Sequence, residues 1–163
     1  MHNPFVGEHL NDQTTVDTAY AADQNFTGAG GFIGYFNVDD VYGEHAANYS
    51  QSVKTSLPDW ANKTAAASGG VVSQQTLEKL FEIQHQLIFG DKVAISEVIV
   101  NAPASSSSTI EYWGLMPFSR GSIHIQSANA SHPAAINPNF FMLDYDVQQQ
   151  VGTARMARNV ATS

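Results

Sequence analysis

The strongest constraint on the fold is a series of strand-like segments that follow one another without a helix between them. Residues 94–100 and 110–115 are rich in β-branched and aromatic side chains, and residues 122–126 alternate apolar and polar positions. A small polar loop at 104–109 separates the first two segments. Strands joined by short connections pair antiparallel, because a parallel pair needs a crossover of about a dozen residues or more. The order predicts an antiparallel sheet, to which the alternating residues 13–20 add a further strand.

Helical periodicity precedes and follows these strands. The segments 42–60, 73–90 and 144–160 each repeat apolar residues every three or four positions. Ser73 is a suitable N-cap for the second segment, and Pro58 is expected to end or kink the first. We therefore predict an α+β fold, with an antiparallel sheet and helices packed on one face, as a single domain over residues 1–163.

Charge and composition exclude several classes of partner. The chain has a net charge of −8 and only seven lysines and arginines, so binding to nucleic acid or to an anionic membrane surface is disfavoured. No apolar run approaches the roughly 20 residues that span a bilayer. Cysteine is absent, which excludes disulfides, thiolate metal sites and cysteine nucleophiles. The six histidines show no metal-ligand spacing, so we expect no metal site, and His85 and His124 are expected on polar faces.

Four N-x-S/T sequons favour a secreted glycoprotein, with Asn25, Asn48, Asn62 and Asn129 as acceptors. Residues 1–5 lack the basic start and the apolar stretch of a signal peptide. Both observations fit an internal segment of a longer secreted protein. The glycines at 28–31 are interpreted as a loop rather than a phosphate cradle, because no strand–loop–helix unit surrounds them.

Two places could carry chemistry. Glu97 lies within an apolar run, where a carboxylate needs a partner, but alternate strand residues face solvent and an exposed glutamate is the simpler interpretation. Glu111 and Trp113 together would suit a carbohydrate, because aromatic faces stack on sugar C–H surfaces and carboxylates accept bonds from hydroxyls. Packing of the aromatic ring against a helix is the commoner arrangement. The pattern alone leaves both alternatives open.

Three ordered motifs narrow the choice. The segments P-F-S-R-G-S-I-H-I at 117–125 and P-A-A-I-N-P-N-F-F at 133–141 resemble the glucose-methanol-choline oxidoreductases, in which P-x-S-R-G precedes a strand. The segment V-G-E-H-L-N-D-Q at 6–13 resembles the V-G-x-N-L-Q-D-H/Q junction of that family, with His9 in place of the usual Asn and Asn11 in place of the usual Gln. The similarity extends over essentially the whole chain. It is closest to the fungal glucose oxidase and FAD-dependent glucose dehydrogenase branch.

The resemblance implies a role for each candidate residue. Glu97 matches the glutamate that hydrogen-bonds one of the paired active-site histidines. Trp113 matches an aromatic residue of the sugar pocket, Glu111 matches an acidic position beside it, and Ile99 stands where glucose oxidases carry Phe. The implied reaction transfers hydride from the sugar C1 to FAD. The implied parent is an enzyme whose substrate domain corresponds to this chain. The resemblance leaves open whether that parent forms a homodimer.

The same resemblance indicates what the chain does not carry. It contains no G-x-G-x-x-G strand–turn–helix for FAD and no segment with the catalytic histidine, so the chain alone is expected to be inactive and not to bind FAD. A missing FAD-binding domain or chain is then its expected partner, beside the sugar substrate. The alternatives are a catalytically inactive secreted module that binds carbohydrate, and a fragment without a function of its own.

Overall fold

The computed structural model describes residues 3–22, 25, 27, 30–102 and 106–162. The glycine segment and the serine loop therefore lie partly outside the described residues, as does the middle of the Asn25 sequon. Thirteen elements follow in chain order: β1 (Glu8–Leu10), β2 (Val16–Ala21), β3 (Gly30–Phe36), α1 (Val38–Tyr42), a 3-10 turn (Gly43–His45), α2 (Ala46–Ala67), α3 (Gln74–His85), a π-helical turn (Gln86–Gly90), β4 (Ser96–Ala102), β5 (Ser107–Gly114), β6 (Gly121–His124), β7 (Ala135–Asn137) and α4 (Asp144–Ala161).

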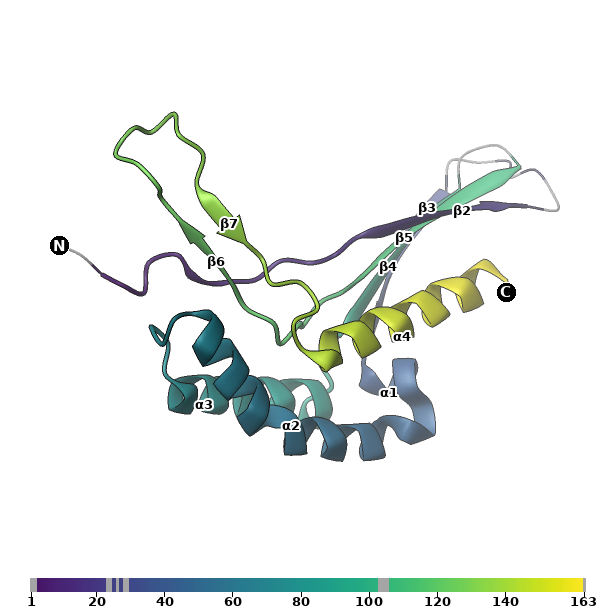
Figure 1. The fold of residues 1–163 in the computed structure, drawn as a ribbon. Coiled ribbons are helices and arrows are strands. Elements are labelled where there is room, and N and C mark those ends of the chain that lie inside the picture. The colour runs from purple at the N-terminus through teal and green to yellow at the C-terminus, as the bar shows by residue number, and fades with distance from the viewer. Residues whose placement is uncertain (1–2, 23–24, 26, 28–29, 103–105, 163) are drawn as a thin grey trace.

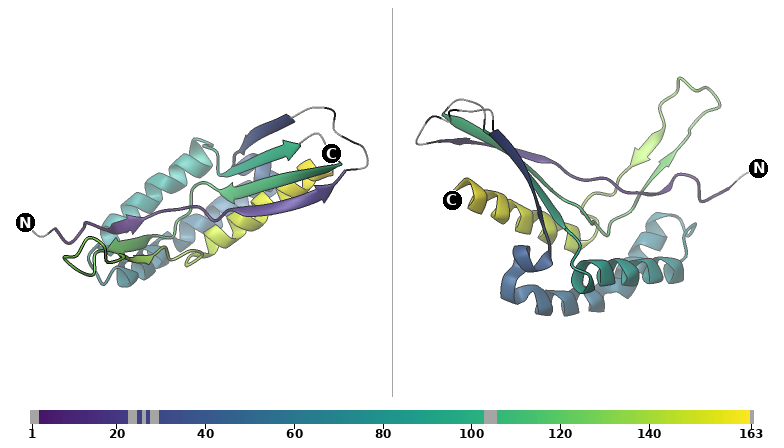
Figure 2. Two further views of the ribbon diagram at one scale, coloured as in Figure 1. Left: turned by 90° about the horizontal axis from the view of Figure 1, so that it is seen from above. Right: turned by 180° about the vertical axis from the view of Figure 1, so that it is seen from behind.

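The strands form two antiparallel sheets rather than one. The larger sheet has the order β2-β5-β4-β3 and the smaller one has the order β1-β6-β7. Helix α4 runs along one face of the larger sheet, while α2 and α3 pack together below it (Figure 1). Seen from above, the four strands lie in front of the helices and their outer face is not covered by any described element (Figure 2, left). The predicted α+β class with helices on one face of an antiparallel sheet is confirmed.

Two hydrophobic clusters hold these layers together. The larger lies between α2, α3 and the segment before α4, and includes Leu57, Phe81, Phe118 and Tyr145. The Phe118 ring meets Phe81 edge-on at 5.3 Å and Tyr145 edge-on at 4.9 Å between centroids, the geometry that aromatic pairs prefer. The smaller cluster joins the sheet to α4 and consists of Val98, Val100, Ile110, Tyr112 and Ala157.

Two local expectations, at Ser73 and Pro58, have different outcomes in the structure. Ser73 accepts a hydrogen bond from the Thr76 amide, so the predicted N-cap of α3 is confirmed. Pro58, in contrast, does not end α2, which continues to Ala67. The cost of proline inside a helix is about 3 kcal/mol, and the burial of Leu57 and Ala61 on either side of it offsets that cost.

Strands β1, β3 and β7 were not predicted. β3 begins at Gly30, inside the segment interpreted as a loop, and its glycines pair with Ala102 and Asn101 at the edge of the sheet. Glycine has a low strand propensity, so the local sequence does not indicate this strand. β7 is a three-residue strand whose side chains are all exposed, which leaves it without a hydrophobic pattern.

Candidate functional site: the open face of the larger sheet

Antiparallel register brings all four candidate residues onto one face of the sheet. Glu97 on β4 lies directly opposite Trp113 on β5, and Ile99 lies directly opposite Glu111. Directly opposed residues share a face, and successive residues alternate between faces. The intervening Val98 is fully buried toward α4, so the four candidate residues point away from the helix. We call this surface the open face.

The open face includes residues of the outer strands as well. They are Asp17 on β2, opposite Glu111, and on β3 Tyr35 and Ile33, opposite Glu97 and Ile99. Trp113, Glu97 and Tyr35 thus form one row across three strands. A second row of Asp17, Glu111, Ile99 and Ile33 crosses all four strands. None of these side chains is cationic, so among the residues of these two rows the charge is negative only.

Both glutamates on this face have a hydrogen-bond donor. The Tyr35 hydroxyl donates to Glu97 Oε1 at 3.1 Å, and Asn101 Nδ2 donates to Glu111 Oε1 at 3.3 Å. The hydrogen bond to Glu97 and the charge of that carboxylate raise the pKa of the Tyr35 hydroxyl above its ordinary value. The sequence left open a glutamate in an apolar site with a partner and a glutamate exposed to solvent; Glu97 is partly buried and has the Tyr35 hydroxyl as its partner.

The opposite face fixes the strands that carry these residues. Ser96, beside Glu97 in sequence, is fully buried and shares a 2.5 Å hydrogen bond with Thr153 of α4. Gln149 Nε2 donates to the Ile95 carbonyl at 2.7 Å, and the Gly114 amide donates to Gln150 at 3.2 Å. These contacts tie the adjoining ends of β4 and β5 to one helix, so Glu97 and Trp113 are positioned by a rigid support.

The P-F-S-R-G motif forms a buried polar junction. Asp146 accepts hydrogen bonds from the Phe118 amide at 2.6 Å and the Ser119 amide at 3.0 Å. Arg120 donates from Nη2 to Gln84 Oε1 at 2.6 Å and from Nε to His9 Nε2 at 3.1 Å. The junction joins α3, α4 and the segment around β1. Its hydrogen bonds hold these three segments together, which indicates a structural role.

Burial is the largest influence on the pKa values of Arg120, Asp146 and His9 in this junction. It lowers the pKa of Arg120 to about 10, although the charge of Asp146 acts in the opposite direction. Burial raises the pKa of Asp146, against the lowering effect of its hydrogen bonds and of Arg120. Burial and then the Arg120 charge lower the pKa of His9. Sequence reasoning missed the roles of Gln84, Asp146 and His9, because hydrogen bonds between distant segments leave no local pattern.

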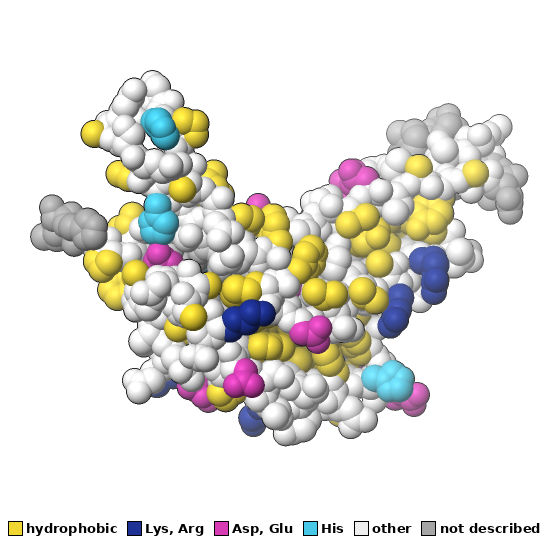
Figure 3. Space-filling view, viewed as in Figure 1, with side chains coloured by type: hydrophobic (Ala, Val, Ile, Leu, Met, Phe, Trp, Pro, Cys, Tyr) yellow, Lys and Arg dark blue, Asp and Glu magenta, His cyan; other side chains and the backbone are white. Residues whose placement is uncertain are grey.

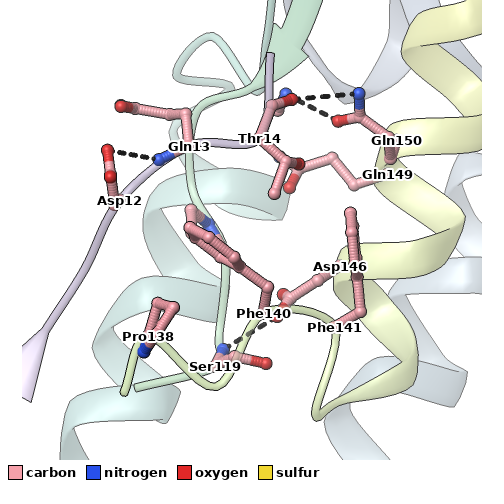
Figure 4. A pocket seen from close by; sticks show the side chains of 12 residues that line it. Asp12, Gln13, Thr14, Ser119, Pro138, Phe140, Phe141, Asp146, Gln149 and Gln150 are labelled. Carbon is pink, nitrogen blue, oxygen red and sulfur yellow. Dashed lines mark hydrogen bonds between the residues drawn. The ribbon is translucent and has the colours of Figure 1, made fainter. Parts of the chain in front are cut away.

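A shallow cleft lies beside this junction, between the segment 12–14 and the start of α4 (Figure 4). Phe140 and Phe141 line it together with Ser119 and Asp146, and Thr14 accepts a hydrogen bond from Gln150 at 3.2 Å. Several polar side chains of the cleft are already engaged in hydrogen bonds within the chain, among them Ser119, Asp146 and Gln149. The candidate residues Glu97 and Trp113 do not line it.

The described histidines are not clustered with other metal-ligating side chains. Within the described part of the chain, no group of three or more His, Asp or Glu side chains could hold a metal ion. His124 is half exposed and lies 3.0 Å from Glu8, in agreement with a polar face. His85 was expected on a polar face but is half buried between α2 and α3, where its Nε2 lies 3.0 Å from the Ser50 carbonyl. Its ring packs at 4.7 Å on Phe89, a partner brought near by the π-helical turn.

The described residues do not fit an FAD site. The diphosphate of FAD is bound at a glycine turn between a parallel strand and a helix N-terminus, and all the paired strands described here are antiparallel. The small number of lysine and arginine residues also disfavours binding of the FAD diphosphate.

All four sequon asparagines lie at exposed positions, Asn25 included. Asn48 and Asn62 lie on exposed positions of α2, and Asn129 lies in the exposed loop between β6 and β7, where its Oδ1 accepts from the Ser131 amide at 3.0 Å.

Exposed hydrophobic side chains occur on the projecting hairpin of β6 and β7, including Ile125, which is 88% exposed (Figure 3). Among the described residues, no helix is both long and apolar enough to cross a membrane.

Comparison with known proteins supports the family resemblance. No family model matches the chain. The glucose oxidase-like protein fsoC of Humicola fuscoatra is 30% identical over 88% of this chain and 24% of its own length. The glucose oxidase of Penicillium chrysogenum is 30% identical over 97% of this chain and 26% of its own length. The chain thus spans about a quarter of the length of the curated relatives it matches.

Solved structures support the same fold. An FAD-dependent oxidoreductase from Chaetomium thermophilum covers 93% of this chain, with a TM-score of 0.63 and 16% identity. A fungal aryl-alcohol oxidase covers 80% of this chain, with a TM-score of 0.64 and 14% identity. This chain corresponds to 30% and 22% of those two chains, respectively. The chain is similar to one segment of these oxidoreductases, and its resemblance to the glucose oxidase branch of the glucose-methanol-choline family is confirmed.

Proposed function

We propose that this chain is the substrate-side part of a secreted, FAD-dependent oxidoreductase that oxidises the C1 hydroxyl of glucose or a related sugar. Residues 1–163 would then form part of its substrate-binding domain. The observation that carries the proposal is the open face, where the cross-strand pairs Glu97–Trp113 and Ile99–Glu111 gather every candidate residue. The similarity to glucose oxidases supplies the reaction class.

The composition of the open face suits a neutral sugar. The indole of Trp113 offers a flat apolar surface for the C–H face of a pyranose ring, and Ile99 and Ile33 extend that apolar surface. Glu111 accepts hydrogen bonds from hydroxyl groups, and Asn101 holds one of its oxygens. The carboxylates and the lack of a cation in the two rows disfavour anionic sugars.

Glu97 has a different task in this proposal. A carboxylate that accepts the N–H of an imidazole fixes the tautomer of the ring and increases the basicity of the other nitrogen. Glu97 would hold in this way a histidine supplied from outside this chain, and that histidine would take the proton of the sugar hydroxyl. FAD would be bound by the partner domain or chain, since the described residues provide no site for it.

Kinetics of the complete flavin-containing enzyme test the proposal. Trp113→Ala should raise KM for glucose up to about tenfold, because stacking on an aromatic ring contributes up to about 1.5 kcal/mol. Trp113→Phe is the matched control, which keeps a ring and should stay within threefold. An unchanged KM in Trp113→Ala, or a complete protein without flavin, would contradict the proposal.

A second candidate is a secreted module that binds carbohydrate without redox chemistry. The observation in its favour is that the described residues do not fit an FAD site. It predicts that the isolated chain binds glucose or an oligosaccharide in calorimetry and loses this binding in Trp113→Ala. Absence of measurable binding by the folded chain would reject the module and leave the enzyme hypothesis untouched.

A further inference from the structure

Tyr35 lies on β3, a strand that sequence analysis did not identify, and makes a specific contact with the proposed site. It is directly opposite Glu97 across the β3–β4 pair, and its hydroxyl donates to Oε1 at 3.1 Å. Among the hydrogen bonds of the described residues, it is the one in which a side chain donates to the Glu97 carboxylate. The ring itself remains 59% exposed, so packing in the core does not explain the residue.

The backbone around Tyr35 is well fixed although β3 is an edge strand. The carbonyl of the next residue, Phe36, accepts a hydrogen bond from the Ile95 amide at 2.8 Å. Asn37 then caps α1 by accepting from the Asp39 and Asp40 amides, and the Asp40 side chain accepts from the Asn37 amide at 2.9 Å. Tyr35 therefore stands just before an anchored strand end, which can hold its hydroxyl in place.

The neighbouring Gly34 contributes to this arrangement. A Cβ atom at Gly34 would lie 2.9 Å from two ring atoms of Phe36, so the aromatic side chain of Phe36 folds over the glycine. That ring packs on the cluster between the sheet and α4. Phe36 thus faces the core while Tyr35 faces outward, as alternation along a strand requires.

A glutamate on an open sheet face has three torsions to order before its carboxylate can serve a catalytic base. We propose that Tyr35 is a positioning residue for Glu97: it holds Oε1 and leaves Oε2 for the histidine that Glu97 serves. The inference rests on the proposed function, which assigns that task to Glu97. Trp113 lies on the other side of Glu97 in the same row, so the two aromatic residues flank the carboxylate.

The test is a double-mutant cycle in the complete flavin-containing enzyme, with glucose as substrate. Tyr35→Phe removes only the hydroxyl, and kcat should fall about fivefold to tenfold, the range of one ordinary intramolecular hydrogen bond. KM should stay within twofold, because the ring remains. Tyr20→Phe is the matched control, since Tyr20 lies on β2 and packs toward the α4 cluster on the other face.

The same substitution is then made in a Glu97→Ala background. There Tyr35→Phe should have no further effect on kcat, because the group that it positions is gone. An equal loss in both backgrounds would show a merely structural role and overturn the inference. A Glu97→Ala enzyme as slow as expected, beside a fully active Tyr35→Phe enzyme, would also overturn it but leave the proposed function standing. A fully active Glu97→Ala enzyme would overturn both.

Discussion

Removal of the Asp146 carboxylate should destabilise the fold more than any other single charge deletion on α4. Asp146 is 5% exposed and accepts two backbone hydrogen bonds, at 2.6 Å and 3.0 Å, from the segment that carries the P-F-S-R-G motif. Asp146→Ala leaves both amides without an acceptor, and a buried unsatisfied donor costs about 1–3 kcal/mol. It also removes the charge that offsets buried Arg120.

These losses are partly compensated. Burial of the ionised carboxylate is itself unfavourable, which is the reason that the Asp146 pKa is raised despite its hydrogen bonds. We therefore expect a net loss of about 3 kcal/mol in the free energy of unfolding for Asp146→Ala. Asp146→Asn keeps one acceptor oxygen and should lose about 1–2 kcal/mol.

Urea unfolding near neutral pH, analysed by linear extrapolation, measures these values. Asp144→Asn is the matched control, because Asp144 lies in the same first turn of α4 but is exposed. It should lose about 0.5 kcal/mol, the typical contribution of a charge at a helix N-terminus. If Asp146→Ala loses no more than Asp144→Asn, the junction does not hold α4 against the motif and the reasoning is refuted.

Three further predictions concern other parts of the chain. Burial raises the pKa of Asp146 above its usual 3.8, so protonation of Asp146 stabilises the fold below that pH, and this contribution is lost as pH rises through the folded-state pKa. In urea titrations, the stability advantage of the unmodified chain over Asp146→Asn should therefore shrink from acid to neutral pH. An advantage that grows instead would contradict the assignment. Gly152→Ala would place a Cβ atom 2.5 Å from Val41 Cγ1, so it should destabilise by about 1–3 kcal/mol in thermal unfolding, whereas a neutral change would show that α1 and α4 are not in contact. Asn129→Gln should reduce the intact mass of protein secreted from a glycosylating host by one glycan, and an unchanged mass would mean that this exposed sequon is not used.

Sequence patterns predicted the parts of the fold that depend on local periodicity. The strands near 94–100 and 110–115 and the Ser73-capped helix were found because side-chain alternation and capping are local signals. The edge strand β3 was missed because glycine at its start masks strand propensity. The separation into two sheets was missed as well, since no pattern within a strand indicates which partner it takes.

The members of the candidate site remain sequence-based predictions, and the structure adds their geometry. Glu97, Ile99, Glu111 and Trp113 came from the family resemblance, and only the β4–β5 register shows that they share a face. Tyr35 could not be found, because it is 62 residues away in sequence from Glu97 and belongs to an unpredicted strand. The roles of Asp146 and Gln84 were hidden for the same reason, since their partners lie on other elements.

The most direct test of the central claim is a crystal structure of the complete flavin-containing enzyme with its sugar bound. We predict that the sugar ring packs on Trp113 over the open face, with a hydroxyl within hydrogen-bond distance of Glu111 and a histidine from outside this chain on Glu97. A sugar bound elsewhere, with Trp113 and Glu97 covered by another segment of the protein, would contradict the assignment of the open face as the substrate side.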